Sequence, residues 1–124
     1  MSDPEVGGVM HLAELMAVPS SPRDLAGWQF ANVANHRDVI RRVYETKGIQ
    51  LVEYPLEPFD PKDPASLNAF LNSHQSMHTD FDTALGLASY NLSEVDWQDP
   101  SNLAQWIQAH FIEHNAASAL LGVS

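Results

Sequence analysis

Three stretches of the chain repeat one pattern of apolar and polar positions, and each predicts an amphipathic helix. In the middle stretch, apolar residues and histidines recur at spacings of three and four from Leu67 to Leu85, which is the period of one helical face. Asp63-Pro64 precedes this run and Gly86 follows it, at the positions expected for a helix N-cap, a first-turn proline and a left-handed C-cap. The pattern predicts a helix from about Pro64 to Leu85.

The same pattern recurs thirty-six residues later without a gap, and a more diverged copy lies upstream. Pro100 and His114 match Pro64 and His78, while the upstream copy begins at Ser21-Pro22. The predicted helices cover residues 22–47, 64–85 and 100–121, within repeats 21–55, 56–91 and 92–124. Residues 1–20 lie outside the repeat and predict an arm or a short helix, with 8–18 as its helical part.

The connections between the predicted helices are long, and they decide how the helices can be arranged. Residues 49–61 read as an extended connection that admits a short strand, and residues 87–98 form the equivalent loop. An extended residue covers about 3.3 Å and a helical residue about 1.5 Å, so each loop can run back along a helix. We therefore expect an all-α fold of three parallel helices around a pseudo-threefold axis, with an up-down bundle as the alternative.

Composition and charge narrow the classes of partner that the chain is expected to bind. The 124 residues suit one domain, and the formal charge of −10 disfavours direct contact with nucleic acid or anionic membranes. The chain has no cysteine, which excludes disulfides and thiolate chemistry. No apolar run approaches the length of a membrane span and no secretory signal is evident. We therefore expect synthesis in the cytoplasm and no membrane partner.

The histidines are the residues on which chemistry concentrates. His74 with His78, and His110 with His114, are pairs four residues apart on one helical face, and such pairs can ligate one metal ion. His36 matches the second histidine of each pair. If the helices are parallel, these residues form two layers that suit zinc or another divalent ion, and an open position could activate water. The candidate ligands are His36, His74, His78, His110 and His114.

A hydrogen-bonded histidine network is the interpretation that the sequence favours over a metal site. Buried neutral imidazoles can donate to loop carbonyls and accept from side chains, and the repeated Asp60 and Asp96 are either their partners or turn formers. Asn32 stands where the other copies have their first histidine, and asparagine is a poor zinc ligand. Glu113 is turned about 100° away from His114 and is expected to be a poor general base. His11 is expected to be a surface or packing residue.

The remaining residues show no motif of an enzyme. No nucleophile elbow surrounds any serine, and no phosphate-binding glycine loop occurs. Catalytic and cofactor-binding residues are therefore expected to be absent.

Several phrases resemble small proteins encoded among the structural genes of tailed bacteriophages. The phrases are WQFANVANHRDVIRRVYETKGIQL, LNAFLNSHQSMHTDFDTALGL and NLSEVDWQDPSNLAQWIQAHFIEHNAASALLGV. The resemblance covers the chain from about Leu25 to its end, and its distinguishing parts are the LxxWIxxHFxEH run and the VDW…DP loop before it. It implies a virion structural or assembly protein that binds capsid, neck or tail subunits. It supplies no catalytic residue.

The sequence thus favours a non-enzymatic virion protein, made in the host cytoplasm and incorporated in the virion as a homo-oligomer with other virion proteins as partners. The alternative is a His-rich helical metal-binding protein, either a metal-dependent hydrolase or an oxygen-handling enzyme. A further set of residues is expected either to contact partners or to be buried under the loops. These residues are Val9, Leu12, Leu15, Met16, Tyr54, Phe59, Tyr90 and Trp97.

Overall fold

The computed structural model describes residues 12–56 and 58–122, and three long helices account for most of them. Their bounds are α2 Pro22–Lys47, α3 Pro64–Leu85 and α4 Pro100–Leu121. These bounds confirm the helices predicted from the repeat. No strand occurs in the described ranges, so the short strand admitted for residues 49–61 is absent there. The fold is all-helical, as predicted.

Each helix begins and ends through the same local chemistry. The side chains of Ser21, Asp63 and Asp99 accept hydrogen bonds from backbone N–H groups of the first turn, and a proline follows each cap. At the other end the chain passes through a left-handed residue with φ of 70° to 72°, a conformation that glycine adopts without steric cost. The capping residues at these ends are Gly48, Gly86 and Gly122.

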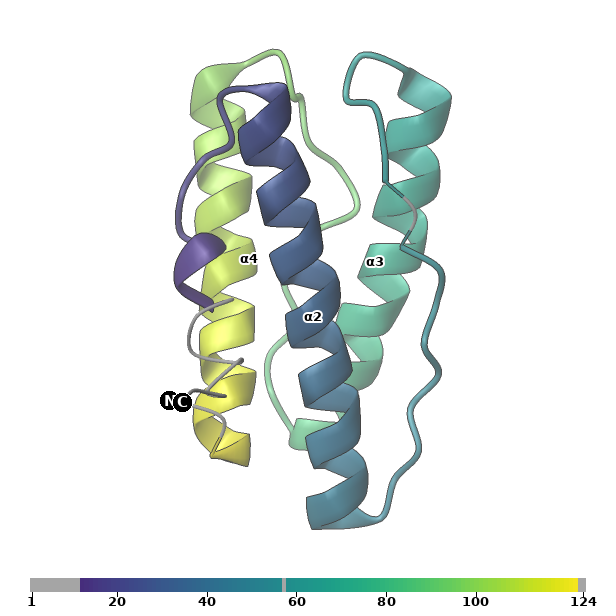
Figure 1. Cartoon of the computed structure of the whole chain (residues 1–124). Coiled ribbons are helices and arrows are strands. Elements are labelled where there is room, and N and C mark those ends of the chain that lie inside the picture. The colour runs from purple at the N-terminus through teal and green to yellow at the C-terminus, as the bar shows by residue number, and fades with distance from the viewer. Residues whose placement is uncertain (1–11, 57, 123–124) are drawn as a thin grey trace.

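The three helices run in the same direction, and the two long loops return the chain to the starting end (Figure 1). The shared direction is the one expected for the parallel arrangement, and it differs from the up-down bundle given as the alternative. Side chains of the helices hold the returning loops: Trp106 Nε1 donates to the carbonyl of Leu92 at 3.2 Å, and Gln29 Nε2 donates to that of Phe59 at 3.2 Å. The Leu92 N–H in turn donates to Gln75 Oε1 at 2.6 Å.

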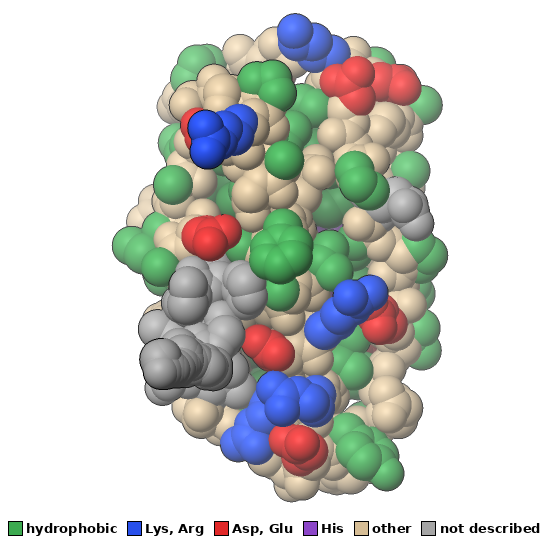
Figure 2. Space-filling view, in the orientation of Figure 1, with side chains coloured by type: hydrophobic (Ala, Val, Ile, Leu, Met, Phe, Trp, Pro, Cys, Tyr) green, Lys and Arg blue, Asp and Glu red, His purple; other side chains and the backbone are tan. Residues whose placement is uncertain are grey.

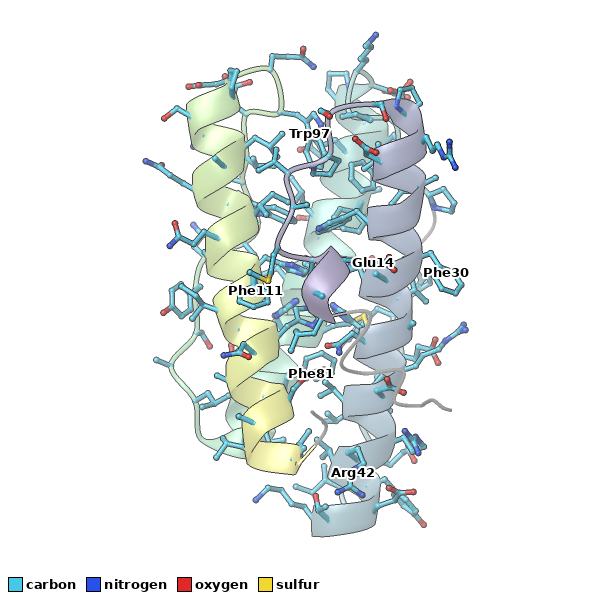
Figure 3. All side chains as sticks on the ribbon, turned by 60° about the vertical axis from the view of Figure 1, so that its left-hand side comes forward. Glu14, Phe30, Arg42, Phe81, Trp97 and Phe111 are labelled. Carbon is cyan, nitrogen blue, oxygen red and sulfur yellow. The ribbon has the colours of Figure 1, made fainter. Side chains whose placement is uncertain are left out.

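The core consists of two apolar clusters stacked along the bundle. The first includes Trp28, Phe70 and Trp106, near the start of each helix, and the second includes Val43 and Phe81, nearer the ends. Figure 3 shows Trp97 toward one end of the bundle and Phe81 toward the other. The histidines of the repeat fall between these clusters in every helix, so a polar layer separates two apolar ones.

The N-terminal segment is less helical than expected within the part that can be described. Only residues 12–14 are helical, and residues 15–17 form turns and a bend before the cap of α2. Leu15 is fully buried in the first apolar cluster, with Leu12 packed against it. A single turn is enough to dock these two side chains, and the chain must then reach the Ser21 cap.

The surface carries interspersed charges of both signs. Figure 2 shows basic and acidic side chains side by side on the visible face, with histidine almost entirely covered. Arg37 pairs with Glu53 at 2.6 Å and Arg42 with Glu45 at 3.1 Å. Within the described residues, no helix has both the length and the apolar character needed to cross a membrane.

Candidate metal centre

Five histidines from the three helices meet in the centre of the bundle. All five residues are at most 1 % exposed. Each can offer one ring nitrogen such that these atoms all lie within 4.8 Å of one another. The five are the residues predicted as alternative metal ligands: His36, His74, His78, His110 and His114.

Three of the Nε2 atoms are too close together to be satisfied by hydrogen bonds alone. His74 Nε2 lies 3.2 Å from His78 Nε2 and 2.9 Å from His110 Nε2. A neutral ring nitrogen has either one proton or one in-plane lone pair, so at most one of these two contacts can be a well-directed hydrogen bond. At least one of the three Nε2 atoms is therefore left without a well-directed hydrogen bond.

Two histidines are oriented by partners on their outer nitrogens. His78 Nδ1 lies 3.2 Å from Glu113 Oε1, and His114 Nδ1 contacts Asn35 Oδ1. Because both oxygens are acceptors, each Nδ1 carries the proton and each Nε2 keeps its lone pair. Outer acceptors of this kind fix the tautomer and direction of metal-binding imidazoles. His114 Nε2 has no hydrogen-bond partner in the described structure.

The rings are arranged with one histidine adjacent to all the others. The centroid of His78 lies 4.4 to 5.0 Å from the other four centroids. Those four follow one another around it in the cyclic order His36, His74, His110 and His114. Neighbouring centroids in this cycle are 4.9, 4.7, 4.3 and 4.8 Å apart, whereas the opposite pair His36 and His110 is 6.4 Å apart.

Burial keeps these imidazoles neutral. Removal from water lowers the pKa of His78 to about 3, and it lowers the pKa of each of the other four well below the usual value. Like charge from neighbouring rings lowers the pKa values of His36, His74, His110 and His114 further. Neutral imidazole is the form that binds a metal ion, so the cluster is in its ligating form at neutral pH.

A pair of buried carboxyl groups adjoins the cluster on the side of His78. Asp82 and Glu113 are each 3 % exposed. Burial and a hydrogen bond with Glu113 raise the pKa of Asp82 to about 7, and burial raises that of Glu113. Glu113 Oε2 also accepts from the backbone N–H of Tyr90 at 2.9 Å. The pair places a negative charge next to the cluster and ties it to the loop after α3.

A surface pocket reaches the cluster beside His36. Its volume is about 350 Å³, and His36 forms part of its wall beside Met77. The exposed Arg37–Glu53 ion pair lies at its rim. Neither nitrogen of His36 has a hydrogen-bond partner among the described residues. His36 is thus the histidine held by ring contacts rather than by hydrogen bonds.

Sequence reasoning missed the outer partners. Glu113 was expected to be turned away from His114, its neighbour in the chain, but it contacts His78 on the neighbouring helix. Its spacing of three from His110 would have placed it on the buried side of α4, and Asp82 follows His78 by four. Asn35 had no comparable signal, because only the packing of α2 against α4 brings it to His114.

Asp60 and Asp96 are turn formers, not partners of histidine. Each accepts a hydrogen bond from the backbone N–H two residues later, at 2.9 Å and 3.0 Å. Asn32 is 1 % exposed, and neither atom of its amide is hydrogen-bonded in the described structure. His11 lies outside the described residues.

The residues expected to contact partners divide between core and surface. Leu15 and Phe59 are buried in the first cluster, and Leu12 and Trp97 pack against it. Tyr54 packs against the second cluster. Met16 and Tyr90 are 61 % and 41 % exposed, so they alone of the described set keep the exposure that a contact surface needs. Val9 lies outside the described residues.

Comparison with known proteins assigns no family: no family model matches the chain, and no curated protein or solved structure matches it. A functional assignment therefore has to rest on the chemistry of the site.

Proposed function

We propose that the protein binds one divalent transition-metal ion through the five buried histidines. The observation that carries the proposal is the convergence of neutral ring nitrogens within 4.8 Å of one another, in an arrangement that hydrogen bonds between the rings cannot fully satisfy. A cation at the centre accepts the lone pairs that these hydrogen bonds leave unused, including the one on His114 Nε2. This proposal takes up the metal-binding alternative of the sequence analysis.

The distances between the rings favour a six-coordinate ion. With a metal–nitrogen distance of about 2.1 Å and roughly 1.1 Å more to the ring centre, imidazoles at right angles have centres about 4.5 Å apart and opposite ones about 6.4 Å. A tetrahedral set would place every pair about 5.2 Å apart. His78 has centroid distances of 4.4 to 5.0 Å, and the 6.4 Å between His36 and His110 matches an opposite pair.

The set of ligand atoms also narrows the choice of metal ion. Zinc in protein sites is almost always four-coordinate, whereas imidazole ligands equally suit iron, nickel and copper. Five neutral imidazoles in a six-coordinate arrangement fit Fe²⁺, Co²⁺ or Ni²⁺ better than zinc. Glu113 would compensate part of the ion's charge through His78, in the manner of a carboxylate–histidine–metal triad.

Native mass spectrometry of the purified full chain tests the proposal. The chain is loaded in turn with Fe²⁺ under anaerobic conditions, Co²⁺, Ni²⁺ and Zn²⁺, and is then desalted. We expect one ion per chain, lost on acidification as the imidazoles become protonated. Visible absorption of the Co²⁺ form reports coordination number, because six-coordinate Co²⁺ absorbs weakly and four-coordinate Co²⁺ strongly.

A His11→Gln variant is the matched control, since His11 is the chain's sixth histidine and lies outside the sequence repeat that supplies the other five. It should bind the ion as the unaltered chain does. Only the bare chain mass, or whole multiples of it, under every loading condition would overturn the proposal.

The virion role remains a separate prediction that rests on the sequence resemblance. The two functions are compatible, because a metal centre in the core leaves the outer faces of the helices for contacts with other subunits.

A further inference from the structure

We infer that the sixth coordination position of this ion lies at Asn32, opposite His78, and that it binds a small exogenous anion. This inference rests on the proposed metal centre and names the ligand class that the centre takes. Each repeat has two positions in the histidine layers, and Asn32 is the residue at these positions that is not a histidine.

The position follows from the way in which the histidines are paired across the cluster. His36 of α2 is opposite His110 of α4, and the cyclic order of the rings places His114 of α4 opposite His74 of α3. In both cases the second histidine position of one helix faces the first position of another.

His78 is the remaining second-position histidine, and it has no opposite partner among the five. The first position not yet assigned is on α2, and Asn32 occupies it, four residues before His36 just as His74 precedes His78. The same rule of pairing therefore assigns the vertex opposite His78 to Asn32.

The state of the Asn32 side chain agrees with this placement. It is 1 % exposed, and both Oδ1 and Nδ2 lack hydrogen-bond partners in the described structure. A buried amide without partners is destabilising, so an additional group that interacts with it would stabilise the folded chain. A metal ion or a metal-bound ligand at the sixth position supplies one.

An amide also makes this position exchangeable. Amide oxygen is a weak ligand for the iron-to-nickel ions compared with imidazole, so an incoming donor can replace it without displacing a histidine. Asn32 Nδ2 then remains next to the incoming atom as a hydrogen-bond donor. The two groups therefore suit a ligand that accepts both a metal bond and a hydrogen bond.

The charge and size of the site determine the class of ligand. Five neutral imidazoles leave the ion's two positive charges uncompensated among its direct ligands, and the buried carboxyl pair contacts the cluster at His78. A small monodentate anion is therefore the expected ligand, because larger groups do not fit between buried side chains. Azide is a suitable probe because it is small, anionic and visible spectroscopically when bound to Co²⁺.

Asn32→His is the decisive variant. It completes the pattern that His74 and His110 set, so we expect it to retain the ion, close the sixth position and weaken azide binding at least tenfold. Asn32→Ala removes the weak ligand together with the Nδ2 donor, so it should keep the ion and leave the sixth position open to azide. Ser118→Ala is the matched control, because Ser118 is also buried with an unpaired polar atom but is not among the ligands.

The experiment measures metal content by mass spectrometry first and azide affinity by absorption titration of the Co²⁺ protein second. Absence of the ion from the unaltered chain would overturn the proposed function, and the inference with it. Bound ion without any azide response would overturn the inference alone. Equal azide binding by Asn32→His and the unaltered chain would also overturn the inference, since the anion would then replace a histidine. His36, which lines the surface pocket, would be the first histidine to test. If Asn32→His does not fold, unchanged azide affinity in both Asn32→Ala and a second variant, Asn32→Leu, would overturn it.

Discussion

Helix α2 and the pair α3 and α4 begin and end alike but differ in the histidine layer. All three have a capping side chain, a proline in the first turn and a left-handed glycine at the end. In the layer between the apolar clusters, α3 and α4 each supply two histidines, whereas α2 supplies Asn32 and His36. The difference shows that the signals that form the helices are independent of the residues that form the site.

The helices differ also in how firmly their imidazoles are held. His78 of α3 and His114 of α4 have an acceptor on Nδ1, from Glu113 and Asn35. His36 of α2 has no hydrogen bond to either nitrogen within the described structure and lines a surface pocket. We therefore expect the histidines of α3 and α4 to contribute most of the metal affinity, and His36 of α2 to be the ligand whose position can change most easily.

The largest effect should come from a double variant on α3 and α4. His78→Gln with His114→Gln removes both oriented imidazoles, so we expect no bound ion and a lower melting temperature. His36→Gln leaves four ligands and should keep the ion with reduced affinity. Mass spectrometry and thermal unfolding of the two variants measure the contrast. Equal loss of the ion in both would break the comparison between the helices.

Acid should destabilise the metal-free protein strongly. The buried imidazoles have pKa values lowered from 6.5, to about 3 for His78, so below pH 6.5 the unfolded chain binds more protons than the folded one. Each such histidine therefore costs about 1.4 kcal/mol of unfolding free energy for every pH unit below 6.5, until its folded pKa is reached. Asp82, with its pKa raised to about 7, acts in the opposite direction between its unfolded value of 3.8 and pH 7. Glu113, whose pKa is also raised, acts in the same direction as Asp82, but the five histidines outweigh the two carboxyl groups.

Denaturant unfolding of the metal-free chain between pH 7 and pH 5 measures this slope. The double variant should show a shallower slope than the unaltered chain, and His36→Gln an intermediate one. A stability that stayed constant or rose on acidification would contradict the burial of neutral histidines.

A smaller effect is expected at Glu113. Glu113→Gln removes the carboxylate that orients His78 and compensates charge, and loss of such an outer partner typically weakens metal affinity 10- to 100-fold. Competition with a chelator of known affinity measures the change. Glu45→Gln is the control, because this acid is exposed and pairs only with Arg42 among the described residues. An unchanged affinity in Glu113→Gln would remove the carboxylate from the site.

The smallest effects should come from the helix caps, where the three helices are alike. Ser21→Ala, Asp63→Ala and Asp99→Ala each remove a side chain that accepts from first-turn N–H groups. We expect a loss of about 1 kcal/mol for each, or roughly 4 °C in melting temperature. Metal stoichiometry should not change in any of the three. A cap variant that lost the ion would show that local helix ends and the site are coupled after all.

Much of the fold could be predicted because its signals are local. A capping side chain, a proline and a glycine act within a few residues of themselves, so the bounds of α2, α3 and α4 could be read from the chain. The extent of the N-terminal helix could not, because residues 12–17 are positioned by the docking of Leu15 into a core formed by other segments.

The candidate site could be predicted only in part. The spacing of His74 and His78, and of His110 and His114, required them to share a helical face, and their burial follows from the apolar residues on that face. The partners of His78 and His114 come from neighbouring helices, and no spacing within one helix contains that information.

The sequence by itself determined the three helices, their ends and the face on which each histidine lies, because these depend on interactions between near neighbours in the chain. Only the tertiary structure decided that the helices run in the same direction. Because they do, five imidazoles meet around one point. The tertiary structure also decided that Glu113 and Asn35 orient two of them. The physical reason is that the direction and rotation of packed helices depend on how their side chains fit across the bundle.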